Sequence, residues 1–167
     1  MTVSRSLLFL ALAGISSAAW AADAESAVPV PAAFVKMAAQ AGIAEIEAGN
    51  IALAKSQDPQ IRSFAERMVA DHGKSNSELA SLAKAKGIDA PVHLDSDHRA
   101  ILDSLQAKSG PDFDAAYSQH MKMDHTKAIA LFEGASRSAD VDFAEFAKKT
   151  LPTLKEHKQL AAGLPGR

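Results

Sequence analysis

The sequence contains no cysteine. Disulfide bonds, thiolate metal ligands and a cysteine nucleophile are therefore excluded, and we expect no lipid anchor on a cleaved cysteine. A chain of 167 residues fits a single domain. A domain of that size buries roughly two thirds of its unfolded surface, so packing alone can hold it together.

The sequence also has little net charge and few signs of catalysis. Its 20 acidic and 18 basic side chains give a net charge of −2, which argues against nucleic acid or an anionic membrane surface as a partner. It contains no glycine-rich phosphate loop and no G-x-S-x-G motif. Beyond the N-terminal segment, no run is apolar enough to span a membrane. The sequence therefore leans away from an enzyme, and a protein partner or a homodimer stays open.

The N-terminal segment has the layout of a secretory signal peptide. Arg5 supplies a positive start, residues 7–15 form a short apolar run, and Ala19-Trp20-Ala21 is a small-x-small cleavage site. We expect cleavage after residue 21, which leaves residues 22–31 as a flexible lead-in and places the mature protein in the periplasm.

The rest of the chain predicts five helices and no strand. Apolar residues recur at helical spacing, and the predicted helices cover residues 32–56, 59–86, 95–108 and 112–136 and a final segment that Asp140 caps. The third helix is short and lies in a long connection between two hairpins. We therefore predict an all-α, ferritin-like, up-down-down-up four-helix bundle over residues 32–161, with a short extra helix in the crossover.

Local signals define several helix ends. Asp58 and Pro59 are typical of an N-cap followed by the first helical residue, and Gly87 is typical of the position just after a helix. Alanine and glycine on the first helix indicate a close helix–helix approach. Pro152 lies inside the last helix, where it should bend the helix or cost about 3 kcal/mol relative to alanine.

A faint internal repeat relates the two hairpins. Aligning Asp71-His72 with Asp124-His125 also matches apolar residues on both sides of each pair. His72 is central to the apolar face of residues 59–86, where a hydrophobic residue is expected, and Glu45 lies within the apolar face of residues 32–56. Each hairpin is therefore predicted to present polar groups to the core.

These polar groups fall at similar heights in the predicted bundle. With a rise of about 1.5 Å per residue, Glu45, His72, Asp124 and His125 all lie roughly 20 Å from the nearest hairpin turn, close to the middle. His157 lies about two helical turns away from that level by the same count. Asp124 and His125 are about 100° apart on their helix, so only one of them points fully inward and both are kept as candidates.

Such a set fits a transition-metal site. Imidazole and carboxylate together suit iron, zinc, copper or manganese, and two methionines near histidine leave copper open. The Glu-x-x-His motif of di-iron bundles is absent, and Asp95-x-x-His98 is the nearest match. The alternative is a buried hydrogen-bond network without metal. We predict that His93 and His98 lie at the surface and that Asp71 pairs with Lys74 or Arg67 at the rim.

Three blocks of the sequence resemble the bacterial family called domain of unknown function 4142. The blocks are FVKMAAQAGIAEIEAGNIALAKSQDPQIRSFAERMVADH, FDAAYSQHMKMDHTKAIALFE and FAEFAKKTLPTLKEHKQL. The resemblance implies a ferritin-like, exported protein without an established activity. Matching the pattern of the family selects Glu45, His72, His125 and His157 and leaves His120 as particular to this chain.

Two functions are therefore predicted. The first is a periplasmic protein that binds a transition metal in the bundle core, for stress tolerance or metal handling. Its ligands would be Glu45, His72, His125 and His157, with Asp124 as a substitute. The second is a non-catalytic structural or interaction bundle in which the same residues form only hydrogen bonds.

Overall fold

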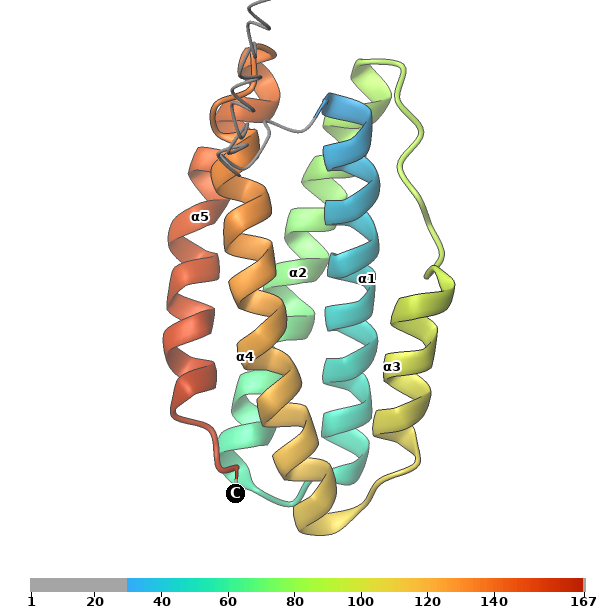
Figure 1. Ribbon diagram of the computed structural model, residues 1–167, viewed down its shortest axis with the longest axis vertical. Coiled ribbons are helices and arrows are strands. Elements are labelled where there is room, and N and C mark those ends of the chain that lie inside the picture. The colour runs from blue at the N-terminus through green and yellow to red at the C-terminus, as the bar shows by residue number, and fades with distance from the viewer. Residues whose placement is uncertain (1–29, 167) are drawn as a thin grey trace, which may run out of the picture.

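The protein is a bundle of α-helices (Figure 1). The computed structural model describes residues 30–166, and no strand occurs in this range. The predicted signal peptide, residues 1–21, and the predicted lead-in up to residue 29 lie outside the described residues. The helices are α1 (Pro31–Lys55), α2 (Pro59–Ala85), α3 (Ser96–Gln106), α4 (Gly110–Ala135) and α5 (Val141–Ala162). The first four helices begin and end within two residues of their predicted boundaries, α5 begins directly after Asp140 as predicted, and the all-α class is confirmed.

The long helices form two antiparallel hairpins, α1 with α2 and α4 with α5. Their turns lie at opposite ends of the bundle, so α2 and α4 run in the same direction (Figure 1). Helix α1 packs against α4, and α2 packs against α5. Helix α3 lies in the crossover and packs on α1. This order is the predicted up-down-down-up arrangement of ferritin-like bundles.

Helix α2 begins and ends as its sequence predicts. The Asp58 carboxylate accepts hydrogen bonds from two backbone amides of the first turn at 2.8 and 3.1 Å, and Pro59 follows at a position that needs no amide donor. At the other end Gly87 has φ +69°, a conformation that side chains with a Cβ disfavour. It allows the amide of Ile88 to turn back to the Ala83 carbonyl at 2.9 Å.

Glycine brings α1 and α2 close together. A Cβ placed on Gly42 would overlap the side chain of Asn76. A Cβ on Gly49 would lie 2.9 Å from Val69 Cγ2 and 3.1 Å from the Ala65 carbonyl oxygen. The predicted close approach is therefore confirmed, and it depends on positions without a side chain.

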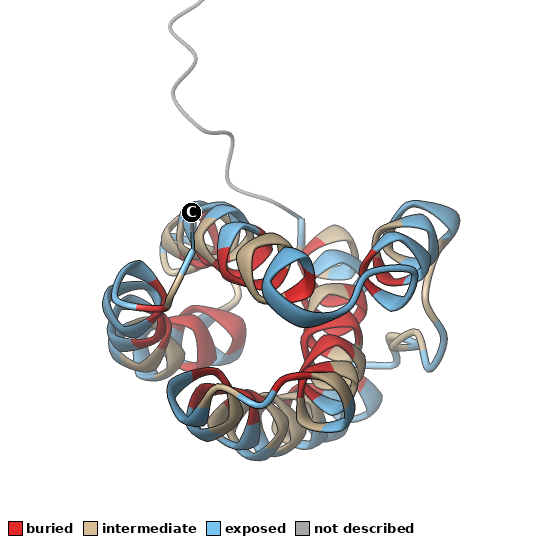
Figure 2. Ribbon diagram, turned by 90° about the horizontal axis from the view of Figure 1, so that it is seen from below, coloured by how far each residue is buried: buried red, intermediate tan, exposed pale blue. Residues whose placement is uncertain are grey.

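The buried residues lie on the inward faces of the four long helices (Figure 2). They form two separate apolar clusters. One surrounds Phe64, Met68, Tyr117 and Met121. The other surrounds Phe34, Leu79, Phe132 and Leu154. Along each long helix, the residues between these clusters include a buried or half-buried polar side chain.

Candidate metal centre

A polar layer separates the two apolar clusters. His72 lies between members of the two clusters on α2, and His125 does so on α4. On α5, His157 likewise lies between members of the two clusters, and Glu45 has the same position on α1. The side chains of Glu45, His125 and His157 are only 4%, 1% and 1% exposed. Burying such groups is costly unless they are paired, hydrogen-bonded or bound to a cation.

Three of these side chains form a compact triangle, the three-histidine group: His72, His125 and His157. Their ring centroids are 5.7, 5.5 and 5.4 Å apart. One ring nitrogen of each histidine lies within 4.8 Å of the corresponding nitrogens of the other two. The group joins three helices, because the residues come from α2, α4 and α5.

His157 therefore lies at the level of the other two histidines, and the predicted offset of about two turns is wrong. The prediction counted only the rise along the helix axis. Side chains on a helix lean toward its N-terminus, and α5 runs opposite to α2 and α4. The ring of His157 therefore leans toward those of His72 and His125, and these lean toward it.

For two of the three rings, a hydrogen bond fixes which nitrogen is engaged outside the group. His125 Nδ1 lies 2.9 Å from the Met121 carbonyl oxygen, which can only accept, so Nδ1 carries the proton. His157 Nε2 lies 2.8 Å from Asp71 Oδ2 and donates to that carboxylate. His125 Nε2 and His157 Nδ1 are left with lone pairs. Within residues 30–166 these two atoms and His72 Nε2 are buried without a hydrogen-bond partner.

The outer side of His157 is held by a chain of charges. Asp71 Oδ2 also lies 3.3 Å from Arg67 Nε, and Arg67 forms an ion pair with Glu156 at 2.8 Å. Partial burial acts against ionisation of Asp71, but the hydrogen bonds from His157 and Arg67 lower its pKa overall. The predicted pairing of Asp71 with Arg67 is confirmed. Asp71 has a second role that the sequence did not indicate, which is to orient His157.

All three imidazoles are neutral at physiological pH. Burial, and then the proximity of the other two rings, lowers the pKa of His72 to about 3. Burial lowers the pKa of His125 to about 4, although its bond to the Met121 carbonyl acts in the opposite direction. Burial also lowers the pKa of His157, against the effect of Asp71. Neutral rings keep the lone pairs with which histidine binds metals.

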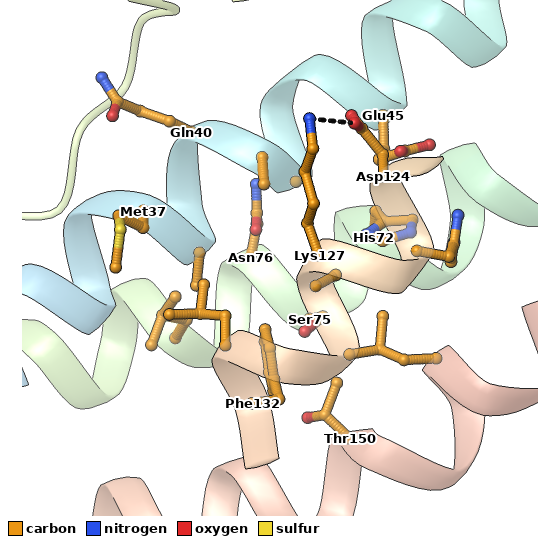
Figure 3. A pocket seen from close by; sticks show the side chains of 18 of the residues that line it. Met37, Gln40, Glu45, His72, Ser75, Asn76, Asp124, Lys127, Phe132 and Thr150 are labelled. Atoms are coloured by element: carbon orange, nitrogen blue, oxygen red, sulfur yellow. Dashed lines mark ion pairs between the residues drawn. The ribbon is translucent and has the colours of Figure 1, made fainter. Parts of the chain in front are cut away.

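A second set of polar side chains, the mixed group, consists of Glu45, His120 and Asp124. One ligand atom from each lies within 4.8 Å of the others. His120 Nε2 is 3.4 Å from Asp124 Oδ2, and Lys127 Nζ is 3.6 Å from Asp124 Oδ1. Figure 3 shows Glu45 beside Asp124, with His72 next to them. The mixed group bridges α1 and α4, whereas the three-histidine group joins α2, α4 and α5.

Burial dominates the protonation of the mixed group. Burial, followed by the charge of Asp124, raises the pKa of Glu45 well above its usual value. Burial lowers the pKa of His120, although Asp124 acts in the opposite direction. Burial and then Glu45 raise the pKa of the Tyr117 hydroxyl. Among the described residues, Glu45 Oε2 and the Tyr117 hydroxyl have no hydrogen-bond partner.

The four predicted ligands thus belong to two groups. The structure brings His72, His125 and His157 together, and it places Glu45 with Asp124 instead. Sequence reasoning set His120 aside, although it lies four residues before Asp124 and so shares its helix face. The four-residue spacing between His120 and Asp124 was the sequence signal that could have identified His120.

The remaining histidines and methionines lie outside both groups. His93 is exposed, as predicted, whereas His98 is half-buried and its Nδ1 lies 2.7 Å from Asp95 Oδ1. Met121 is buried in an apolar cluster, and Met123 is 49% exposed. Met121 therefore serves in core packing and Met123 lies at the surface, and neither belongs to a ligand group.

A cavity of about 640 Å³ runs beside both groups. Glu45, His72, Asp124, His125 and His157 line it. Met37, Gln40, Lys127 and Thr150 are among its other lining residues (Figure 3). One cavity, open to solvent at Met37 and Lys127, therefore borders residues of both groups.

Comparison with known proteins supports the resemblance found in the sequence. A family model described as Domain of unknown function (DUF4142) matches residues 16–164. The chain belongs to this family. The DUF4142 chain also resembles the crystal structure of a DUF305 fragment from Deinococcus radiodurans, with a TM-score of 0.72 and 15% identity. That match covers 82% of this chain and 95% of the fragment, and at such low identity it shows the shared fold alone.

Two further findings bear on the DUF4142 chain. No significant match is found among curated proteins. Across the described residues, every helix is too short or too polar to cross a membrane.

Proposed function

We propose that this protein binds one transition-metal ion through His72 Nε2, His125 Nε2 and His157 Nδ1 and that it serves in metal handling. Two observations carry the proposal: one ring nitrogen of each histidine lies within 4.8 Å of those of the other two, and within the described chain one ring nitrogen of each is buried without a hydrogen-bond partner. Metal-binding histidines usually donate their other ring N–H to a carboxylate or a backbone carbonyl. His125 and His157 both do so.

The same geometry disfavours a hydrogen-bond network as the sole role of the group. The outward bonds of His125 and His157 leave both inner nitrogens as acceptors. His72 Nε2 can donate a single proton, so it can satisfy only one of them. One acceptor is then still without a donor, and a cation that accepts three lone pairs satisfies all three nitrogens at once.

The donor set indicates the kind of metal. Three imidazole nitrogens without a carboxylate suit zinc or copper better than manganese. Three histidines also leave a fourth coordination position open, as in catalytic zinc sites. We therefore narrow the metals considered from the sequence to zinc and copper for this group, with copper expected to bind more tightly.

Calorimetry and thermal melting of metal-free, untagged protein test the proposal. The three-histidine group should bind one zinc or copper ion per chain. At a metal concentration 100 times the Kd, the added stability is about 2.7 kcal/mol, or roughly 5 to 10 °C in Tm for a chain of this size. His125→Gln should abolish this shift, and His93→Gln, at an exposed position, should keep it.

The alternative function makes a different prediction for the same experiment. If the group only orders the helices, His72→Ala lowers Tm by the same amount with and without metal. Absence of any metal-induced shift in the unmodified protein would refute metal binding.

We also propose that the protein acts in the periplasm. The support is the signal-peptide layout of the N-terminal segment, which lies outside the described residues. N-terminal sequencing of the protein recovered from a periplasmic extract should begin at Ala22. Recovery of the intact chain from the cytoplasm would refute export.

A further inference from the structure

The mixed group is a second place where cation-binding atoms converge. Glu45 contributes a carboxylate from α1, and His120 and Asp124 contribute an imidazole and a carboxylate from α4. One ligand atom of each lies within 4.8 Å of the other two. His120 and Asp124 are four residues apart, so one helix face presents both toward Glu45.

The charges around this group do not satisfy Glu45. Its side chain is 4% exposed, and Oε2 has no hydrogen-bond partner within residues 30–166. Lys127 approaches Asp124 at 3.6 Å, but its own side chain is 75% exposed, so it lies on the outer side (Figure 3). On α3, His98 Nδ1 lies 2.7 Å from Asp95 Oδ1, so this histidine already has a partner other than Glu45. Glu45 is thus a buried carboxyl group beside the half-buried carboxylate of Asp124, and a cation between the two would satisfy both.

We propose that Glu45, His120 and Asp124 form a second metal site that takes a divalent ion of the manganese or ferrous type. Two oxygen donors and one nitrogen make a harder ligand set than three imidazoles. The open cavity beside the group leaves room for water to complete the coordination of such an ion. The site is independent of the three-histidine group, because the two share no ligand.

The two sites are nevertheless neighbours. Asp124 and His125 follow each other on α4, and both line the same cavity. Helix α4 therefore supplies ligands to both, with Asp124 directed toward α1 and His125 toward α2 and α5. This arrangement makes the protein a carrier of two ions with different ligand preferences.

Titration of metal-free protein with Mn²⁺, followed by the paramagnetic resonance signal of the free ion, tests the proposal. The wild-type chain should bind one Mn²⁺, and Glu45→Gln should weaken binding by at least about 10-fold. Because Glu45→Gln keeps the size of the side chain, the fold should persist, which circular dichroism checks. His120→Gln is the second variant and should have the same effect. His125→Gln is the matched control and should keep Mn²⁺ binding.

The outcomes separate this site from the three-histidine group. In the Glu45→Gln variant, zinc or copper binding by the three histidines should be unchanged. No Mn²⁺ bound by the wild-type protein would overturn the proposal. Equal Mn²⁺ binding by wild type and both variants, or its loss in His125→Gln alone, would also overturn it. Loss in His125→Gln alone would assign the Mn²⁺ to the three-histidine group, whereas loss in Glu45→Gln and His120→Gln supports the second site whether or not the three histidines bind zinc or copper.

Discussion

Mild acid should destabilise the metal-free protein through its buried histidines. Burial lowers the pKa of His72 to about 3 and that of His125 to about 4, whereas an unfolded histidine titrates near pH 6.5. Between those values the unfolded chain binds more protons than the folded chain. The free energy of unfolding therefore falls as the pH falls from about 6.5 to about 3.

The size of the effect follows from the same pKa values. Between pH 7 and pH 5, one histidine that stays neutral in the folded state removes roughly 2 kcal/mol of stability. Glu45 acts in the opposite direction, because its raised pKa favours the folded state as the pH falls toward 4.5. The pH dependence of the wild-type protein alone is therefore a sum of opposing terms, and variants are needed to isolate the histidines.

Urea denaturation of chelator-treated protein at pH 7 and pH 5 provides the assay. His72→Gln should lose roughly 2 kcal/mol less than wild type over this interval, whatever its stability at pH 7. His93→Gln, at an exposed position of the connection before α3, is the control and should match wild type. The same loss in His72→Gln as in wild type would refute the reasoning, since it would show that His72 is protonated or exposed in the folded state.

Three further predictions concern packing, orientation of the site and helix capping. Gly49→Ala should lower the free energy of unfolding by about 1 to 3 kcal/mol because its Cβ meets Val69 and the α2 backbone, whereas Gly73→Ala, with open space around it, should raise it by about 0.5 to 1 kcal/mol. Urea denaturation should show changes of opposite sign in the free energy of unfolding of the two variants. A Gly49→Ala variant as stable as wild type would contradict the close approach of α1 and α2. Asp71→Ala should weaken zinc binding by about 10 to 100-fold in a competition titration, because His157 loses the acceptor that orients it. Unchanged affinity would show that packing alone holds the ring. Asp58→Ala should cost about 0.5 to 2 kcal/mol in thermal melting through loss of the α2 cap, and no cost would argue against the capping bonds.

The helices and their order could be predicted because their signals are local. Caps such as Asp58, the glycine at position 87 and the spacing of apolar residues act over one or two helical turns. Short and long connections then decide which helices are neighbours. Pro152 was also correctly placed inside the last helix.

The division of the polar core could not be predicted in this way. The sequence placed Glu45 with His72 and His125 because these three were assigned to one level of the bundle, and it placed His157 about two turns away. Which side chains meet depends on which helices are adjacent and on the direction in which each side chain leans. Glu45 faces α4 from α1, and it meets Asp124 and His120 there.

The sequence by itself determined an all-α bundle with histidines and carboxylates on its inner faces, because helical periodicity alone decides which residues face the core. Only the tertiary structure decided that His72, His125 and His157 share one centre and that Glu45 belongs to another. The opposed directions of α2 and α5 bring the rings of His72 and His157 to one level. The bond from His157 to Asp71 joins α5 to α2 and exists only after the chain has folded, whereas the bond from His125 to the Met121 carbonyl is local to α4.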